Sequence, residues 1–500
     1  MPKPPKSYPT RPAHSTYAGI VVSDDLSPQA WQRLWHRLYP VRRFVHWMTR
    51  STVNMSIVII CVGLTIYVVK PKLERLFLPM SFQDGSSTNS ASTASAPAPD
   101  SAGPAGSSVG TTQTGENPNA ASAANPTSNT GADSTVTPTP ASTNTTVTNS
   151  VNVESYGAAG NGFTDDTAAL NTAFSRAPAG STLVLSAGKT YKHTGLLKVR
   201  VAGLHITGSG TLLATNELDS ALQINANNVT VDGGLYFRFN TAGIARQNAG
   251  WETMIFVQGC SGTHLSNITI DGSPSAGILF LDASNYTVDT VLVENTLADS
   301  IHSTNGSYNG LIENSTSINS GDDGFANVSY TSNAVQVHDI TYENDTVRNQ
   351  LWGRGFSVVG GHDITFNNIH VDGTSSSAAI YVASEANFKT YGVANVHVHG
   401  ATINHANANN AVVLIADSQP AYSITDVDMS DVVITNVSAG VPQVVGIQAH
   451  AGTGILRIGL YRFTITGPQL PFALSGTSPA SYSTVGWTVN NAHVADHIGF

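Results

Sequence analysis

Two adjacent aspartates stand between glycines in the segment SINSGDDGFANVS, residues 317–329. They are unusual in this chain, because only 11% of its residues are Asp, Glu, Lys or Arg. Carboxylates held close together repel one another, so one keeps its proton at a pH where another is ionised. An acid and a base side by side can transfer protons to and from a bond that is being cleaved. Asp322 and Asp323 are therefore the first candidates for catalysis.

The chain around these aspartates repeats loosely every 21 to 31 residues or so from position 151 onward. Each repeat holds a short β-type run, an Asn- or Asp-rich corner, a small residue and a second β-type run. Examples are SNITIDGSPSAGILFLDAS, residues 266–284, and HDITFNNIHVDGTSSSAAIYVAS, residues 362–384. Alternation within the runs turns one side chain inward and the next outward. Repetition without hairpin signals predicts an all-β fold, a right-handed parallel β-helix with coils about 4.8 Å apart.

Aligning the repeats on the residue that enters the second strand places the candidates in one column. The aligned apolar residues are Ile278, Ile301, Phe325, Phe356 and Ile380. Two positions before three of them stand Asp299, Asp323 and Arg354, on successive coils. We expect the carboxylates there to lie about 5 to 7 Å apart. The residues predicted to form one catalytic cluster are Asp299, Asp322, Asp323, Arg354 and His302.

A structural interpretation of single aspartates stays open. Asp and Asn are common at solenoid corners, where their side chains bond nearby backbone, and Asp-Gly is a turn pair. The dipeptides His338–Asp339 and His362–Asp363 occupy the same repeat position, and we interpret them as strand-start residues. Arg354 argues against a purely structural role for this column, because basic residues are rare here: residues 247–347 contain no Lys or Arg.

Four segments resemble motifs of known enzymes. GDDGFAN at 321–327 resembles the GDD motif of the polygalacturonases and related pectin-type glycoside hydrolases, and ADSIHS at 298–303 resembles their NTDGID motif. GRGFSVVGG at 353–361 resembles their GHG-I-S-x-G segment. YGAAGNGFTDDTAALNTAF, residues 156–174, is similar to the opening signature of the pectate-lyase-superfamily β-helix proteins. The resemblance implies a parallel β-helix that hydrolyses glycosidic bonds.

The resemblance also implies roles for individual residues. Asp322 would be the general acid, while Asp299 and Asp323 would hold and activate the attacking water. The sequence departs from the family in two places, since Arg354 replaces the motif histidine and His302 replaces the last Asp of NTDGID. The coil that grips an acidic sugar in that family reads AAIYVASE here. Its candidates for substrate binding are Tyr381, Glu385 and, beyond it, Lys389.

Two other functions are compatible with these residues. A polysaccharide lyase or C5-epimerase would hold Ca²⁺ on the aspartates, since Ca²⁺ prefers oxygen ligands, and would use Arg354 as the base. Such a base needs a lowered pKa, which is demanding for a guanidinium. The non-enzyme alternative is an anchored carbohydrate-binding β-helix, because a fold alone does not define a function. Hydrolysis without a cofactor is our first expectation, with an exopolysaccharide favoured over pectin as the substrate.

The residues before the repeats form three regions. Residues 1–50 are polar, whereas residues 51–69, STVNMSIVIICVGLTIYVV, carry no charge and would span roughly 28 Å as a helix, about one bilayer core. Eight basic residues precede this run and three follow it closely, which predicts a cytoplasmic N-terminus. The Ser/Thr/Ala/Pro-rich residues 70–149 predict a disordered linker. Residues 150–500 would then lie outside the inner or plasma membrane, in a periplasm or at the cell surface.

Composition also restricts partners and covalent links. The net charge of −10 leaves no basic patch for nucleic acid. Cys61 lies in the apolar run and Cys260 in the distant body, so no internal disulfide is expected, and no zinc-ligand spacing is present.

An open coil at the end of the solenoid exposes strand edges. The amphipathic pattern at 162–177, with Asp165 and Asp166 in its first turn, predicts a helix that caps the N-terminal coil.

Overall fold

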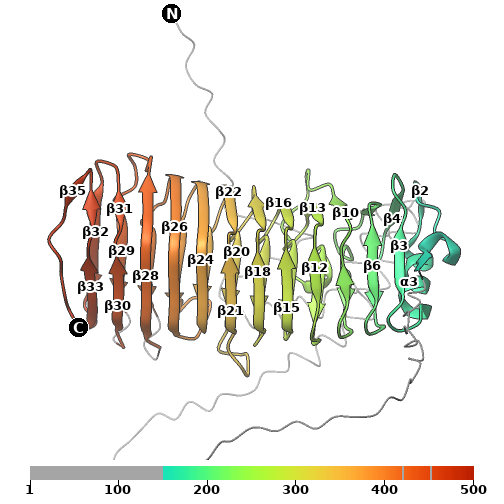
Figure 1. Cartoon of the computed structure of the whole chain (residues 1–500), viewed down its shortest axis with the longest axis horizontal. Helices are drawn as coiled ribbons and strands as arrows, with labels where there is room; N and C mark the ends of the chain where they lie inside the picture. Colours follow the sequence, from blue (N-terminus) through green and yellow to red (C-terminus); the bar gives the residue numbers. More distant parts are fainter. Residues whose placement is uncertain (1–149, 419–421, 451–452) are drawn as a thin grey trace, which may run out of the picture. The chain divides into compact units, whose positions relative to one another are not determined.

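The computed structural model describes residues 150–418, 422–450 and 453–500. The predicted cytoplasmic segment, transmembrane helix and linker, all within residues 1–149, lie outside these residues. In the described ranges, no helix is long and apolar enough to cross a membrane. Figure 1 shows these ranges as a stack of coils that runs from β2 and α3 at one end to β35 at the other. The predicted all-β parallel solenoid is confirmed.

Each coil contributes strands to three parallel columns that run along the stack. The first column contains β1 (Ser150–Asn152), β3 (Thr182–Leu185), β6 (His205–Gly208), β9 (Thr230–Val231), β12 (His264–Ser266), β15 (Ser284–Asp289), β18 (Tyr308–Glu313), β21 (His338–Glu343), β30 (Ile455–Tyr461) and β33 (Ala480–Val485). The second contains β2 (Asn161–Asp165), β4 (Thr190–His193), β7 (Thr211–Ala214), β10 (Tyr236–Phe239), β13 (Thr269–Ser273), β16 (Leu292–Thr296), β19 (Thr316–Ile318), β22 (Thr346–Gln350), β31 (Thr464–Ile465) and β34 (Thr488–Val489).

Three long strands bend through both of these columns and join them into one 24-stranded sheet. They are β24 (Gly361–Thr374), β26 (Val393–Ala406) and β28 (Ile424–Thr435). The same sheet ends in β35 (Ala492–His493), which pairs antiparallel with β34. The third column is a separate sheet of 11 strands: β5 (Leu197–Val199), β8 (Leu222–Ile224), β11 (Ile255–Gln258), β14 (Ile278–Leu281), β17 (Ile301–Thr304), β20 (Phe325–Val328), β23 (Phe356–Val359), β25 (Ile380–Ser384), β27 (Ala411–Asp417), β29 (Gln443–Ala449) and β32 (Leu470–Gly476).

Asn and Asp residues with positive φ form many of the corners between strands. Asn314, Asn344 and Asn368 have φ of 53°, 57° and 51°. Their side chains form a ladder along the stack, in which each amide donates to the Oδ1 of the preceding coil, at 3.4 and 2.7 Å. Short polar side chains tolerate this left-handed backbone because they bond locally. Asp339 and Asp363 have the same conformation. His338 begins β21, and its register partner His362 is the second residue of β24, which confirms the His-Asp dipeptides as strand-start residues.

The interior of the solenoid fixes the register of the candidate column. The residues aligned from the sequence are direct partners on β14, β17, β20, β23 and β25: Ile278, Ile301, Phe325, Phe356 and Ile380. Each is at most 1% exposed. Phe325 and Phe356 stack with ring centroids 4.8 Å apart. Burial of such side chains stabilises the fold by about 1.5–3 kcal/mol each, so the register that positions the aspartates is strongly held.

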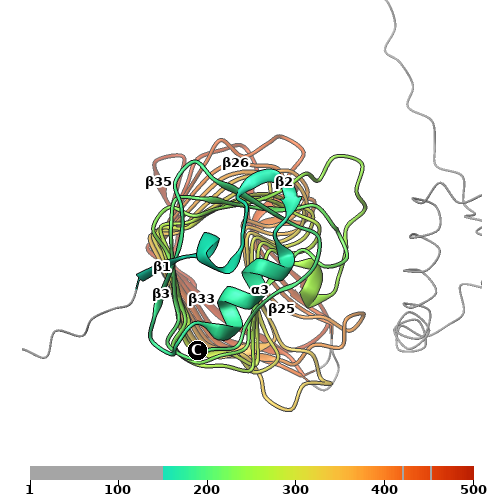
Figure 2. The same cartoon turned by 90° about the vertical axis from the view of Figure 1, so that its right-hand side faces the viewer.

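The predicted helix at 162–177 is shorter in the structure, where α3 spans Thr167–Arg176. Residues 161–165 instead pair with β4 as strand β2. The reason is local: buried Asp166 turns back and accepts hydrogen bonds from the N–H groups of Ala159 and Gly160, at 2.7 and 3.0 Å. Figure 2 shows α3 across the end of the stack, within the outline of the coils. The helix residues buried in the core are Leu170, Ala173 and Phe174. Two 3-10 helices complete the fold: η1 (Val153–Tyr156) and η2 (Gly250–Glu252).

Asp345, fully buried at the corner between β21 and β22, makes stability depend on pH. Its Oδ1 accepts a hydrogen bond from the Ser315 N–H at 2.8 Å, while its Oδ2 has no partner among the described residues. Burial raises the pKa of Asp345 from 3.8 to about 8. The folded state therefore holds a proton that the unfolded state releases, and this stabilisation is lost as the pH rises toward 8.

We expect the melting temperature to fall between about pH 6 and pH 8, because the folded state binds more protons than the unfolded state there. Asp345→Asn keeps the acceptor for Ser315 and cannot ionise, so it should reduce this slope, to which the raised pKa of Asp323 also contributes. Asp339→Asn, at a corner whose side chain is 54% exposed, is the matched control and should leave the slope unchanged. Thermal unfolding followed by circular dichroism measures both. A wild-type melting temperature that rises with pH over this range would contradict the assignment.

Candidate functional site

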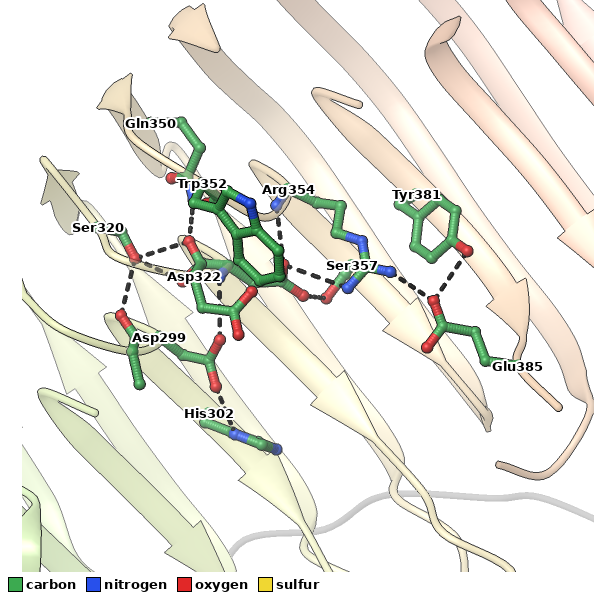
Figure 3. A network of polar contacts seen from close by, with 12 residues as sticks. Asp299, His302, Ser320, Asp322, Gln350, Trp352, Arg354, Ser357, Tyr381 and Glu385 are labelled. Atoms are coloured by element: carbon green, nitrogen blue, oxygen red, sulfur yellow. Dashed lines mark hydrogen bonds and ion pairs between the residues drawn. The ribbon is translucent and has the colours of Figure 1, made fainter. Parts of the chain in front are cut away.

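The candidate site lies where strands β17, β20 and β23 of the 11-stranded sheet begin (Figure 3). Backbone hydrogen bonds fix the stacking of its segments. The Ser300 N–H donates to the Asp323 carbonyl at 2.9 Å, and the Gly324 N–H donates to the Arg354 carbonyl at 2.8 Å. Asp299, Asp323 and Arg354 therefore stack on three successive coils, as the sequence alignment predicted.

The three aspartates are closer together than predicted. Asp299, Asp322 and Asp323 each present one carboxylate oxygen, and these oxygens lie within 4.8 Å of one another. The coil spacing alone suggested about 5 to 7 Å. The protein brings the carboxylates closer because it surrounds them with donors and cations. A separation of about 6.5–9.5 Å between acid and base leaves room for a water between them. The nearest oxygens of the three aspartates lie closer together than this.

Asp299 is the carboxylate that the site keeps ionised. Its side chain is 10% exposed, and its Oδ1 accepts a hydrogen bond from the Asp323 N–H at 2.9 Å. Its Oδ2 lies 2.7 Å from Nδ1 of His302. Burial would raise the pKa of Asp299, but the charge and hydrogen bond of His302, with the charge of Arg246, lower it overall. Burial would lower the pKa of His302, but Asp299 raises it overall, so the two form an ion pair.

Asp323 is the most deeply buried member of the cluster, with a side chain that is 5% exposed. Its Oδ1 accepts a hydrogen bond from the Arg354 N–H at 2.8 Å, and its Oδ2 accepts one from the Ser357 hydroxyl at 2.5 Å. Burial raises the pKa of Asp323, the Arg354 charge opposes this, and the charges of Asp322 and Asp299 add to the rise. The net effect places this pKa at about 7, so Asp323 holds a proton over part of the neutral range.

Asp322 is the most exposed of the three carboxylates, at 15% of its side chain. Its Oδ2 accepts a hydrogen bond from Nη1 of Arg246, which comes from the segment between β10 and β11. Burial and the charge of Asp299 raise the pKa of Asp322, while Arg246 and Arg354 lower it. The rise prevails, so the site favours the protonated form of Asp322 more than water does.

The predicted substrate-binding residues divide into two groups. Tyr381 and Glu385 join the cluster: Arg354 donates from Nη2 to Oε1 of Glu385, and the Tyr381 hydroxyl donates to the same oxygen at 2.9 Å. The guanidinium carbon of Arg354 also lies 4.3 Å from the centroid of the Tyr381 ring. Lys389 is exposed in the loop after β25, and within the described ranges no side-chain contact links it to these residues.

Arg246 and Gln350 are site residues that the sequence reasoning missed. Arg246 stands 76 positions before Asp322, and no repeat alignment connects the two. The feature of the sequence that could have identified Arg246 is its position as the last basic residue before residues 247–347, which contain no Lys or Arg. Gln350 donates from its side-chain amide to the carbonyls of Asp322 and Trp352, and so ties the two loops together. Gln350 was harder to identify from the sequence, since only its position at the end of β22 distinguishes it.

The carboxylates do not fit the Ca²⁺ site that the lyase alternative requires. Ca²⁺ takes six to eight oxygen ligands. Five of the six oxygens of Asp299, Asp322 and Asp323 already accept hydrogen bonds from groups of the protein. The positive charges of Arg246 and Arg354 lie beside Asp322 and Asp323 and would repel a cation. A metal ion at this point would have to displace these partners.

Gly353 is required by the packing of the aspartates. Its φ is 75°, and a Cβ at this position would lie 2.5 Å from Oδ1 of Asp322 and 2.7 Å from Oδ1 of Asp323. We expect Gly353→Ala to lower the melting temperature and to reduce activity at least about tenfold, because the added methyl displaces the reacting carboxylates. Gly180→Ala is the matched control, since Gly180 has a φ of 73° and nothing within 4 Å of the added Cβ. Equal activity losses in the two variants would show backbone strain alone and contradict the packing argument.

Residues 150–375 match the family model described as rhamnogalacturonase A/epimerase, pectate lyase-like. This region is a parallel β-helix that is similar to the pectate-lyase-like family. All of the predicted catalytic residues lie within the matched region, whereas Tyr381, Glu385 and Lys389 lie just beyond it. No curated protein matches the chain.

Solved structures share the fold of the pectate-lyase-like β-helix. The catalytic domain of a GH87 α-1,3-glucanase in complex with nigerose is 18% identical with a TM-score of 0.54, over 71% of this chain and 66% of the glucanase chain. The Agl-KA catalytic domain is 18% identical with a TM-score of 0.56, over 69% of this chain and 66% of that one. PfbA, a surface adhesin of Streptococcus pneumoniae, is 13% identical with a TM-score of 0.54, over 68% of this chain and 91% of the adhesin. This chain thus spans just under two thirds of the glucanase domains, and the likeness shows the fold.

Proposed function

We propose that the β-helix is a glycoside hydrolase that degrades a polysaccharide with Asp299, Asp322 and Asp323. The observation that carries the proposal is the division of protonation among three carboxylates within 4.8 Å of one another. The pKa of Asp299 is lowered, whereas the pKa values of Asp322 and Asp323 are raised. Neighbouring carboxyl groups in opposite protonation states are the requirement for acid–base cleavage of a glycosidic bond.

The spacing of the aspartates supports this proposal. Structures of the GH87 α-1,3-glucanase include three variants in which one aspartate is replaced by alanine, each in complex with nigerose or tetrasaccharides. Two of the replaced aspartates are adjacent, and the third precedes the first of them by 23 positions. Asp299 precedes the adjacent pair Asp322 and Asp323 by the same interval.

The proposed reaction uses the difference in exposure within the cluster. Asp322, the most exposed, donates its proton to the glycosidic oxygen as the bond breaks. Ionised Asp299 accepts a proton from the water that attacks the anomeric carbon, and Asp323 helps to hold this water. Arg246 donates to Oδ2 of Asp322, so the proton can be carried by Oδ1 of the same carboxyl group, which accepts no hydrogen bond from the described residues. Arg354 and Ser357 keep Asp323 in place throughout.

The lyase and epimerase alternatives are disfavoured by the state of Arg354. Burial by itself lowers the pKa of this arginine, but the charges of Asp323 and Glu385 outweigh burial and raise it well above its usual value. A guanidinium held between two carboxylates stays protonated, so it cannot remove a proton from a sugar carbon. Its contacts assign it instead to positioning Asp323 and Glu385.

A second candidate function is sugar binding without cleavage. The adhesin PfbA supports it, because its fold is equally similar and its described role is adhesion. Incubation of the chain with neutral and uronic-acid polysaccharides separates the candidates. Reducing ends without ultraviolet absorbance support the hydrolase, reducing ends with the absorbance of an unsaturated uronate indicate a lyase, and retention on a glycan without product indicates a binding protein.

The cellular location belongs to the same proposal. The apolar run at 51–69 would anchor the chain in an inner or plasma membrane, with the β-helix in the periplasm or outside the cell. An enzyme held there would meet exopolysaccharide before other substrates. Fractionation of cells that express the full chain tests the anchor: we expect the protein in the membrane fraction and its β-helix accessible to added protease from the extracytoplasmic side. Recovery in the soluble cytoplasmic fraction would refute it.

The proposed roles predict the pH dependence of kcat/KM. Activity should decline above about pH 7, where the Asp322–Asp323 pair loses its proton, and should decline in acid as Asp299 becomes protonated. His302→Gln removes a charge that lowers the pKa of Asp299, so the acid limb should move upward by about one unit. His338→Gln, at a histidine that begins β21 and pairs with Asp339 and not with the cluster, should leave both limbs in place. An unchanged acid limb in His302→Gln would remove Asp299 as the base.

A further inference from the structure

The charged groups of the candidate site already neutralise one another. The pairs are Arg246 with Asp322, Arg354 with Glu385, and His302 with Asp299. Asp323 adds a fourth carboxylate, which shares Arg354 at 3.7 Å. The cluster thus contains four carboxylates, two guanidinium groups and one imidazole. A carboxylated sugar would meet cations that already pair with protein carboxylates, and would find no net positive charge in the cluster.

Trp352 presents a large apolar surface beside this neutralised cluster. Trp352 is 59% exposed, although tryptophan is usually largely buried in folded proteins. It stands in the short loop between β22 and β23, in front of Asp322 as seen in Figure 3. Leu351 beside it is 53% exposed and extends the apolar surface. An exposed indole next to carboxylates suits the apolar C–H face of a sugar ring, whose hydroxyl groups remain free to bond at the ring edge.

The backbone holds Trp352 at a fixed place relative to the carboxylates. Its carbonyl accepts a hydrogen bond from the Gln350 side chain, which also donates to the Asp322 carbonyl. The next residue, Gly353, packs directly against Asp322 and Asp323. A ring that stacks on the indole would therefore bind close to Asp322.

Tyr381, the aromatic residue that contacts Arg354, does not offer such a face. The guanidinium of Arg354 covers the ring of Tyr381, with 4.3 Å between the guanidinium carbon and the ring centroid. The Tyr381 hydroxyl donates to Glu385. Among the described residues of the cluster, Trp352 is the ring that faces outward.

We propose that Trp352 is the stacking platform for a neutral sugar ring, and that the site takes a neutral polysaccharide and not a polyuronate. This inference rests on the proposed function for its site but concerns binding, so the two can fail separately. Trp352 selects and orients the sugar beside Asp322, while the charge pairing of the arginines excludes a carboxylated ring.

The test measures binding in the full chain carrying Asp322→Asn, which prevents turnover. The probes are nigerose and longer α-1,3-linked glucose oligosaccharides, β-linked glucose oligosaccharides, and polygalacturonate. Calorimetry should show saturable binding of at least one neutral probe and weaker binding of polygalacturonate. Adding Trp352→Ala should raise the Kd of that neutral probe about tenfold, and Trp352→Phe should restore most of the affinity. Phe163→Ala, which removes an 85% exposed aromatic side chain on β2, should change Kd less than about twofold.

In the active chain the same Trp352→Ala substitution should raise KM more than it lowers kcat. An unchanged Kd in Trp352→Ala overturns the platform, and tighter binding of polygalacturonate overturns the neutral substrate class. Failure of every neutral probe to bind also overturns the inference. Trp352-dependent binding of a neutral probe without hydrolysis in the active chain supports the inference and refutes the hydrolase.

Discussion

Asp322→Asn is expected to lower kcat/KM about 10²- to 10⁴-fold while the β-helix stays folded. The amide has the size of the carboxyl group but cannot donate a proton to the glycosidic oxygen. The side chain is 15% exposed and its partner Arg246 is 40% exposed, so the freed guanidinium can reach water. The charge of Asp322 also raises the pKa of Asp323, so that pKa should fall in the variant. Initial rates on the best polysaccharide and thermal unfolding measure the two effects.

The matched control for Asp322 is another aspartate paired with an arginine. Asp431 accepts hydrogen bonds from Nε and Nη2 of Arg462 on an exposed corner of the later coils. Asp431→Asn removes the same kind of ion pair without touching the cluster, and should leave kcat/KM within about twofold of wild type. Asp322→Asn with wild-type turnover would show that the general acid is another group.

Asp323→Asn is expected to abolish activity to a similar extent, also without unfolding. The amide oxygen can accept from the Arg354 N–H, and the amide nitrogen can donate to Ser357, whose hydroxyl can turn to accept. Burial makes the charged form of Asp323 costly above its pKa of about 7. The variant should therefore be at least as stable as wild type at pH 8, because it carries no charge to bury. Its lost activity would then reflect the lost carboxylate.

Ser357→Ala distinguishes the contribution of the Asp323 carboxylate from that of the hydrogen bond that supports it. It removes the hydrogen bond to Oδ2 of Asp323 and leaves the carboxylate in place. We expect a loss of about tenfold in kcat/KM, well short of the loss in Asp323→Asn, and a raised pKa for Asp323. Equal losses in Ser357→Ala and Asp323→Asn would mean that Asp323 serves only to hold the loop, and would remove it from the reaction.

The sequence predicted the fold and the aligned column for one physical reason. Ile301, Phe325 and Phe356 must all enter the core at the same point of each coil, because a shift by one residue would expose them. Residues a fixed distance before them, such as Asp299 and Asp323, are then carried into one column. Strict periodicity of the buried positions is thus enough to predict where the aspartates lie.

Features that do not follow this periodicity could not be predicted. Arg246 reaches Asp322 from a segment outside the regular strands, where its position depends on the path of an irregular chain. The start of α3 depends on the side chain of Asp166, which bonds backward to Gly160 and not into the helix. The approach of the carboxylates to within 4.8 Å depends on the cations around them, and coil spacing alone did not include these.

The most direct test of the account is the product formed by the full chain from polysaccharides of known linkage. Neutral α- and β-glucans and polygalacturonate would be incubated with the wild type and with Asp322→Asn, and reducing ends and ultraviolet absorbance recorded together. We predict new reducing ends from a neutral glucan, no absorbance of an unsaturated product, and loss of the signal in Asp322→Asn. Reducing ends that persist in Asp322→Asn, or products that form only from polygalacturonate with rising absorbance, would contradict hydrolysis by the aspartate cluster.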